Sequence, residues 1–264
     1  MRIRTLWMFI GLMVMPGTAV AQWTDCPGTY AGTNCNDPGW TVCSMSGTDI
    51  TCDFAATSTR NLIYVVTESS VAYAYGTYDV TGTPVDFCCQ FNSSTNVKIW
   101  GGLGADLVCL TDADVHHCSD NDGGGSQVFS GDSYISTGEG DDRIDTAVWG
   151  AHSDTVLSGS ENDLVSVYDG DDFVSCGQGD DVASGGDGAD AMCGDTGLDE
   201  LYGNSGPDCL CHEDAVWPHG PDYSPDYVAG GTGVDEGYWY NLPSENDTDD
   251  GSISMLEECN CDCP

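Results

Sequence analysis

A nine-residue repeat that runs without a gap from Trp149 to Tyr238 is the feature that most restricts how this chain can fold. Aspartate is the sixth residue of every unit except one, where Trp217 stands instead. The aspartates are Asp154, Asp163, Asp172, Asp181, Asp190, Asp199, Asp208, Asp226 and Asp235. A disordered, glycine-rich acidic linker would show no such phase, so the periodicity predicts a repeated structural unit.

Two further positions of the unit are specialised. The eighth residue is apolar in most units, from Val156 to Val228. The fourth is usually glycine, at Gly170, Gly179, Gly188, Gly197, Gly206 and Gly233. Glycine permits the positive φ angles of a tight turn, and the last three residues can then form a short strand whose eighth side chain points inward.

One unit thus makes a turn and a strand, and two units complete one coil. Successive coils stack as parallel strands about 4.8 Å apart. The predicted fold class is all-β, a parallel β-roll (β-solenoid) of nine-residue repeats. One inward side chain per unit is too little apolar burial to offset the conformational entropy lost by the coil, so another interaction must hold the turns.

The two-unit period divides the aspartates between two edges of the roll. We expect Asp154, Asp172, Asp190, Asp208 and Asp226 on one edge, and Asp163, Asp181, Asp199 and Asp235 on the other. Stacked carboxylates repel one another unless a divalent cation lies between them. With carbonyl oxygens from the glycine turns they form the all-oxygen ligand set that Ca²⁺ prefers over Mg²⁺ or transition metals. The spacing predicts about six Ca²⁺ ions, held by these aspartates and by Gly170, Gly179, Gly188, Gly197 and Gly206, with binding coupled to folding.

At these residues the chain resembles the hemolysin-type (RTX) calcium-binding nonapeptide repeat, G-G-x-G-x-D-x-U-x, where U is apolar. Gly185 to Asp190 and Gly230 to Asp235 match it through the whole turn. The resemblance is strong over 149–238, fair over 101–145 and absent from 22–91. It implies a calcium-driven β-roll. The pattern is broken where His152, Glu161 and Ser224 replace the fourth glycine, so calcium sites at those turns depart from the family pattern.

The chain ends differ from the repeats. Residues 1–21 have a short basic head, an apolar run and a small-x-small cleavage site, as in a secretory signal peptide, which predicts an extracellular or cell-surface protein. Residues 22–100 are predicted to be a cysteine-rich N-terminal β cap on a roll that spans 101–238; a carbohydrate- or surface-binding module is the alternative. Residues 239–264 are predicted to be an acidic, cysteine-rich tail, with an EF-hand loop over 246–257 as the weaker interpretation.

Fifteen cysteines in an exported chain predict disulfides, since no paired CxxC motif supports structural zinc. Cys193 and Cys211 are both ninth residues of a unit and stand two units apart. Neighbouring parallel strands would bring their Cα atoms within the range of a disulfide. We therefore expect both to face outward, and a bridge between them is one possibility; pairing elsewhere is the other.

Charge and motifs bound the function. The chain has 44 acidic and 5 basic residues, a formal charge of −39, which disfavours nucleic acids and anionic membranes and favours cations as partners. No run of apolar residues is long enough for a membrane span, and no catalytic motif is present, so no enzyme is expected. The sequence predicts a secreted calcium-binding protein with a structural or adhesive role. The alternatives are a calcium-binding accessory module of an extracellular enzyme and a module that binds glycan or another ligand.

Overall fold

The computed structural model describes residues 43–46, 48–54, 61–68, 71–79, 84–92, 96–112, 131–146, 152–211, 227–233, 235–238, 248–249 and 253–255. These residues form strands and the turns that join them, and none of them is helical. The signal peptide predicted for residues 1–21 lies outside the described residues. None of the described residues forms a helix long and apolar enough to cross a membrane.

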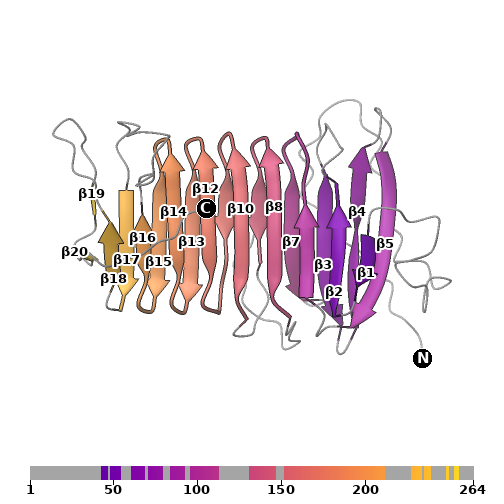
Figure 1. Cartoon of the computed structure of the whole chain (residues 1–264), viewed down its shortest axis with the longest axis horizontal. Coiled ribbons are helices and arrows are strands. Elements are labelled where there is room, and N and C mark those ends of the chain that lie inside the picture. The colour runs from indigo at the N-terminus through magenta and orange to yellow at the C-terminus, as the bar shows by residue number, and fades with distance from the viewer. Residues whose placement is uncertain are drawn as a thin grey trace.

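The strands form two ten-stranded sheets that face each other along the whole length of the molecule (Figure 1). Sheet A contains, in spatial order, β1 (Cys43–Ser46), β2 (Asp49–Asp53), β6 (Asn96–Trp100), β8 (Ser133–Glu139), β10 (Asp154–Ser160), β12 (Phe173–Gln178), β14 (Ala191–Thr196), β16 (Cys209–Cys211), β18 (Asp235–Tyr238) and β20 (Ile253–Met255). Sheet B contains β19 (Thr248–Asp249), β17 (Tyr227–Thr232), β15 (Glu200–Ser205), β13 (Val182–Asp187), β11 (Leu164–Ser166), β9 (Arg143–Asp145), β7 (Leu107–Asp112), β3 (Leu62–Glu68), β4 (Val71–Asp79) and β5 (Pro84–Asn92).

The chain alternates between the sheets, so that each coil contributes one strand to each. From β6 and β7 onward, every described pairing between neighbouring strands is parallel. In the centre of the molecule the step is two units of the repeat: Val156 pairs with Val174, which pairs with Met192, which pairs with Leu210. The predicted parallel β-roll is confirmed.

The strands within 22–100 continue the same two sheets. β2 pairs in parallel with β6, and β3 pairs in parallel with β7. Antiparallel pairs complete this end of the molecule: β1 with β2, β3 with β4, and β4 with β5. A disulfide joins Cys43 to Cys52 across the first of these pairs, as expected of a disulfide-bonded β cap.

At the other end the step between coils lengthens, which corrects part of the expected stacking. Glu200 pairs with Tyr227 and Cys209 with Glu236, a step of three units instead of two. The unit around Trp217 therefore contributes no coil of its own among the described residues. The extra unit moves Asp235 from the edge of Asp199 to the edge of Asp208. Asp226 lies outside the described residues.

Strands also occur within 239–264, where the sequence predicted an acidic linker. β19 pairs in parallel with β17, and β20 pairs in parallel with β18. Both strands fall in the range considered for an EF-hand loop, and they extend the sheets of the roll instead.

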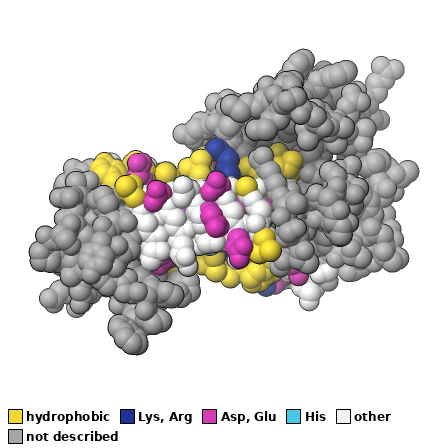
Figure 2. Space-filling view, turned by 90° about the horizontal axis from the view of Figure 1, so that it is seen from above, with side chains coloured by type: hydrophobic (Ala, Val, Ile, Leu, Met, Phe, Trp, Pro, Cys, Tyr) yellow, Lys and Arg dark blue, Asp and Glu magenta, His cyan; other side chains and the backbone are white. Residues whose placement is uncertain are grey.

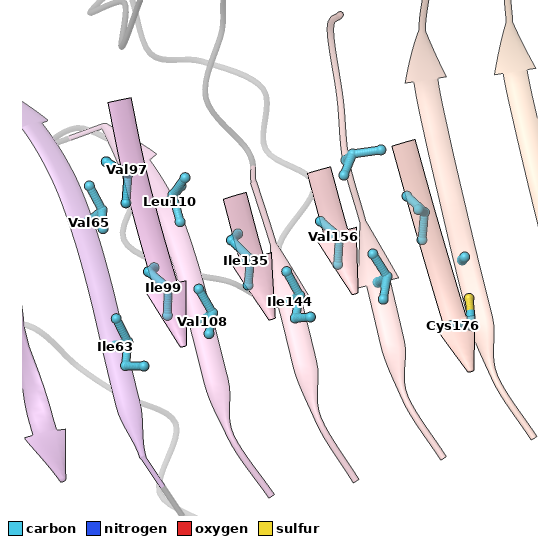
Figure 3. Packing of buried hydrophobic residues seen from close by; sticks show 14 of the residues in the cluster. Ile63, Val65, Val97, Ile99, Val108, Leu110, Ile135, Ile144, Val156 and Cys176 are labelled. Carbon is cyan, nitrogen blue, oxygen red and sulfur yellow. The ribbon is translucent and has the colours of Figure 1, made fainter. Parts of the chain in front are cut away.

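The core lies between the sheets and is built from two inward positions per unit, although the sequence predicted one. The eighth position supplies buried side chains such as Val174 and Leu201, and the first position supplies others such as Val167 and Cys176. Figure 3 shows the larger of these side chains, from Ile63 to Val156, pointing into the space between the sheets. Further along, glycine occupies the first position, at Gly185, Gly194 and Gly203, so this position adds no side chain to the interior there.

The cysteines at the ninth position lie on the outer face of sheet A, as expected from their register. Cys193 pairs with Cys211 across β14 and β16, and the two form a small cluster with Phe173 and Cys209, separate from the main core. Both are buried in spite of facing outward. Both are disulfide-bonded, and the bridge between them stays a prediction. Cys176 in the main core carries a free thiol.

Candidate metal centre

The sixth-position aspartates form two ladders, one along each turn edge of the roll. The first ladder immediately precedes or begins the strands of sheet A, and the second ladder precedes the strands of sheet B. All of the described members are buried, with at most 3% of their surface exposed. They are Asp154, Asp172, Asp190 and Asp208 in the first ladder, and Asp163, Asp181 and Asp199 in the second. Figure 2 views one turn edge, where acidic side chains are visible among the white atoms of the described surface.

One oxygen of each carboxylate ties neighbouring coils together. In the first ladder the backbone N–H of Asp172 donates to Oδ1 of Asp190 at 3.0 Å, and the N–H of Asp190 donates in turn to Oδ1 of Asp208 at 3.0 Å. In the second ladder the N–H of Asp163 donates to Oδ1 of Asp181 at 2.7 Å, and the same contact joins Asp181 to Asp199 at 2.9 Å. The ladder therefore fixes each carboxylate in one orientation.

The other oxygen, Oδ2, has no hydrogen-bond partner in several of these side chains although it is buried. This holds for Asp163, Asp172, Asp181 and Asp190. An ionised carboxylate that loses its water without gaining a compensating contact is strongly disfavoured. Burial, the largest cause, accordingly raises the pKa of Asp163 and Asp172 to about 8, of Asp190 to about 7 and of Asp181 to about 6.

In the turns of Asp190, Asp199 and Asp208, glycine at the first position keeps the space around Oδ2 free. A Cβ added to Gly194 would lie 2.6 Å from Oδ2 of Asp199, and Cβ atoms on Gly185 and Gly203 would collide with Oδ2 of the aspartates five residues later. The fourth-position glycines serve the neighbouring coil. Gly188, Gly197 and Gly206 have positive φ angles, and a Cβ on any of them would collide with the fourth-position carbonyl oxygen of the preceding coil. At these glycine turns the fourth-position carbonyl oxygen therefore faces the next coil with no side chain between them.

This donor set is chemically suited to a hard cation. It consists of carboxylate and carbonyl oxygens, which Ca²⁺ binds in sets of six to eight. No three His, Cys, Asp or Glu side chains converge on one point in the described part of the chain, so backbone carbonyls would supply a large share of the ligands.

The RTX calcium-binding nonapeptide repeat matches the chain in four copies, over residues 130–147, 150–183, 168–201 and 175–210. Residues 130–210 are RTX repeats. RTX repeats are calcium-binding, non-catalytic structural units, and the matched residues cover the part of the roll in which most of both ladders lies. No curated protein and no solved structure matches the chain significantly.

The second ladder of the RTX roll begins earlier than the sequence indicated. The N–H of Asp142 donates to Oδ1 of Asp163 at 2.8 Å, and the N–H of Asp106 donates to Oδ1 of Asp142 at 2.6 Å. Asp142 shares the buried, unpartnered Oδ2, and burial raises its pKa to about 7. Sequence reasoning missed both members because the step between coils is longer here. Both aspartates occupy the sixth position of a repeat unit, at 101–108 and 137–145, and this position could have identified them.

The fifth position of the RTX unit carries an outer row of side chains that the sequence analysis also missed. Oδ1 of Asp180 accepts the N–H of Leu198 at 3.1 Å, and Oδ1 of Asn162 accepts the N–H of Asp180 at 2.9 Å. On the other edge, Oδ1 of Asp171 accepts the N–H of Ala189 at 2.9 Å. These side chains are at the surface, and the Asp-Asp pairs of the sequence, such as 171–172 and 180–181, were their signal.

Two of the turns that lack the fourth glycine are described. His152 is buried, and its Nε2 lies 3.6 Å from Oδ1 of Asp154. Burial raises the pKa of the Asp154 carboxyl, and the nearby histidine partly opposes this rise. Glu161 adopts a φ of 73°, and its carboxylate accepts the N–H of Gly140 at 2.9 Å. The Glu161 turn thus keeps the positive φ of the glycine turns with a side chain in place of the glycine. Ser224 lies outside the described residues, as does the side chain of Asp235.

A depression of about 380 Å³ lies apart from both ladders. Arg143, Asp145, Tyr168, Ser184 and Asn204 are among its lining residues. None of the ladder aspartates contributes to it, so it is not part of the candidate metal centre.

Proposed function

We propose that this protein is an exported calcium-binding β-roll in which stacked Ca²⁺ ions between the coils drive folding, and that it serves a structural or adhesive role outside the cell. The observation that carries the proposal is the set of buried Oδ2 atoms without a hydrogen-bond partner. A divalent cation beside them would replace the lost water and cancel the charge, which no described side chain at the ladders does.

The proposed ligands are the sixth-position carboxylates and the fourth-position carbonyl oxygens of the turns. They are the carboxylates of Asp154, Asp163, Asp172, Asp181, Asp190, Asp199, Asp208, Asp226 and Asp235, and the carbonyl groups of Gly170, Gly179, Gly188, Gly197 and Gly206. One ion between successive coils gives about six ions. Asp142 joins the set, because its carboxylate shares the features of the other ladder members.

The small amount of apolar surface buried in the central coils explains why calcium would drive folding. Gly185, Gly194 and Gly203 fill inward positions in the central coils, so these coils bury little apolar surface per residue. Ordering them costs conformational entropy that such a core does not offset. Calcium binding would supply the missing free energy, as in metal-dependent domains whose site exists only in the folded state.

The proposed location rests on the signal-like residues 1–21 and on the cysteines, since disulfides persist in oxidising compartments. Extracellular calcium is also high enough to fill weak oxygen sites of millimolar affinity. A structural or adhesive role follows from the long two-sheet body, whose RTX unit is non-catalytic.

Calcium titration of two matched variants tests the proposal. Asp181→Asn removes a buried ladder carboxylate, and Asp180→Asn removes the same charge from its exposed neighbour. Asn162 already occupies the position equivalent to Asp180 one coil earlier and makes the same hydrogen bond, so the control preserves the structure. We expect isothermal titration to show fewer bound Ca²⁺ ions for Asp181→Asn and an unchanged number for Asp180→Asn. Equal losses would refute the ligand assignment, and no binding by the unaltered protein would refute the function.

A further inference from the structure

At the N-terminal end of the second ladder, protein groups alone supply hydrogen bonds to both carboxylate oxygens of Asp106. Oδ1 of Asp106 accepts the backbone N–H and the side-chain Nδ2 of Asn61, each at 2.8 Å. Its Oδ2 accepts the N–H of Gly102 at 3.1 Å. Both oxygens of this buried carboxylate are therefore hydrogen-bonded, whereas Asp142 and Asp163 further along have a buried Oδ2 without a partner. Hydrogen bonds to both oxygens stabilise the charged form without a metal.

The interior at this end is filled with large side chains. Ile50, Phe54, Ile63, Ile99 and Leu110 are completely or almost completely buried. Figure 3 shows the isoleucines at 63 and 99 and Leu110 close together between the sheets. The central coils bury fewer apolar side chains: Val174, Cys176 and Ala183 in one coil and Met192 and Leu201 in the next, with glycine at 185, 194 and 203. Apolar burial per coil is thus concentrated at the N-terminal end of the roll.

Local connections add to this core. The Cys43–Cys52 disulfide and the β3–β4–β5 meander join residues close in sequence, so little entropy is lost in closing their loops. An ion pair of 2.6 Å between Lys98 Nζ and Asp49 Oδ2 joins β6 to β2. The coils beyond β8 lack such local pairs among the described residues, because their strands pair only with strands of neighbouring coils.

We propose that the strands β1 to β7 form a folding nucleus that is stable without calcium and that templates the calcium-dependent coils in one direction, from β8 towards β16. The proposal rests on the proposed function, because it assigns calcium dependence to the coils beyond the nucleus. β6 and β7 present the edges on which β8 and β9 pair. The N–H of Asp106 orients Asp142, the first carboxylate with an unpartnered Oδ2, so the first calcium turn is aligned by the nucleus.

Hydrogen exchange followed by mass spectrometry tests this in the full oxidised chain without residues 1–21, in excess Ca²⁺ and in EGTA. We expect peptides from 61–68 and 96–112 to exchange slowly in both solutions. Peptides from 154–211 should exchange at least a hundredfold faster in EGTA than in Ca²⁺. Fast exchange of both regions in EGTA, with protection of both in Ca²⁺, would overturn the nucleus and leave the calcium proposal intact. Slow exchange of 154–211 in EGTA would overturn the calcium dependence itself.

A matched pair of variants locates the cause. Asn61→Asp removes the Nδ2 donor and places a second carboxylate beside Asp106. Asn162→Asp changes an exposed amide, and the new aspartate keeps an Oδ1 that can accept the same hydrogen bond. In EGTA we expect protection of 96–112 to fall at least tenfold for Asn61→Asp and to stay unchanged for Asn162→Asp. If protection of 96–112 in EGTA is the same in both variants, Asn61 does not stabilise the nucleus, and the proposed cause is wrong.

Discussion

Replacing Asp190 by asparagine should change the stability of the roll in opposite directions with and without calcium. Oδ1 of Asp190 accepts the N–H of Asp172, and an asparagine Oδ1 can accept the same bond. Oδ2 is buried without a hydrogen-bond partner, and burial raises the pKa of this carboxyl to about 7. The exchange therefore removes a buried charge and preserves the contact between coils.

The size of each effect follows from the position of Asp190. In EGTA at pH 8, replacing the unpaired charge by a neutral amide should raise the free energy of unfolding by about 1–3 kcal/mol, because an unpaired buried charge costs more than an unpaired neutral polar group. In calcium, Asp190 stands between Asp172 and Asp208 and so borders two gaps between coils. A site filled at a hundredfold excess over its dissociation constant contributes about 2.7 kcal/mol, so loss of one or two sites should lower stability by about 3–5 kcal/mol.

Urea unfolding of the oxidised protein, monitored by circular dichroism, measures both effects. The control is Asp171→Asn, an exchange at the surface of the preceding coil on the same edge, which should change stability by less than about 0.5 kcal/mol. In EGTA the benefit of Asp190→Asn should shrink as the pH is lowered and disappear below about pH 4, because the carboxyl is then neutral in the unfolded chain as well as in the metal-free native state. A variant that is destabilised equally in calcium and in EGTA would refute the reasoning.

Three further predictions concern pH, the turns and the core. Burial raises the pKa of the ladder carboxyls to between about 6 and about 8, so the metal-free native state binds more protons than the unfolded chain. The stability of the metal-free protein should therefore fall as pH rises from about 4 to about 8. Urea midpoints across this range in EGTA measure the fall. Gly197→Ala should destabilise the calcium-loaded roll by more than about 1 kcal/mol, because φ is 141° and the new Cβ collides with the carbonyl oxygen of Gly179; thermal unfolding measures the loss, and an unchanged midpoint would contradict it. Leu201→Ala in the core should cost about 2–5 kcal/mol in urea unfolding, whereas Leu198→Ala, at a side chain 42% exposed, should cost less than about 1 kcal/mol; equal losses would contradict the register.

The centre of the fold could be predicted from the sequence because the repeat there is uninterrupted. The two-unit period alone gives the pairing of Val156 with Val174 and of Met192 with Leu210. It also gives the stacking of the central aspartates, since side chains one coil apart are neighbours in a parallel roll. The same periodicity identified the ninth-position cysteines as cross-strand neighbours.

Insertions limited the prediction at both ends. A constant period cannot show whether an atypical unit forms a coil of its own, so the three-unit step between β16 and β18 moved Asp235 from its expected edge. Longer steps before β10 likewise hid Asp106 and Asp142. The inward first position was missed for another reason. Several units have glycine or serine there, and these residues give no apolar signal in the sequence. Ser158 and Cys176, which occupy this position, nevertheless prove to be buried.

The thiol of Cys176 gives the most direct test of the claim that calcium folds the roll. This side chain is fully buried in the central coils, and it is the free cysteine of the described residues. Maleimide labelling of the native oxidised protein, with the labelled residue located by mass spectrometry, should be at least a hundredfold slower at Cys176 in Ca²⁺ than in EGTA, and Mg²⁺ should not restore protection. Equal protection of Cys176 in Ca²⁺ and in EGTA would contradict the account, because the roll would then fold without the metal.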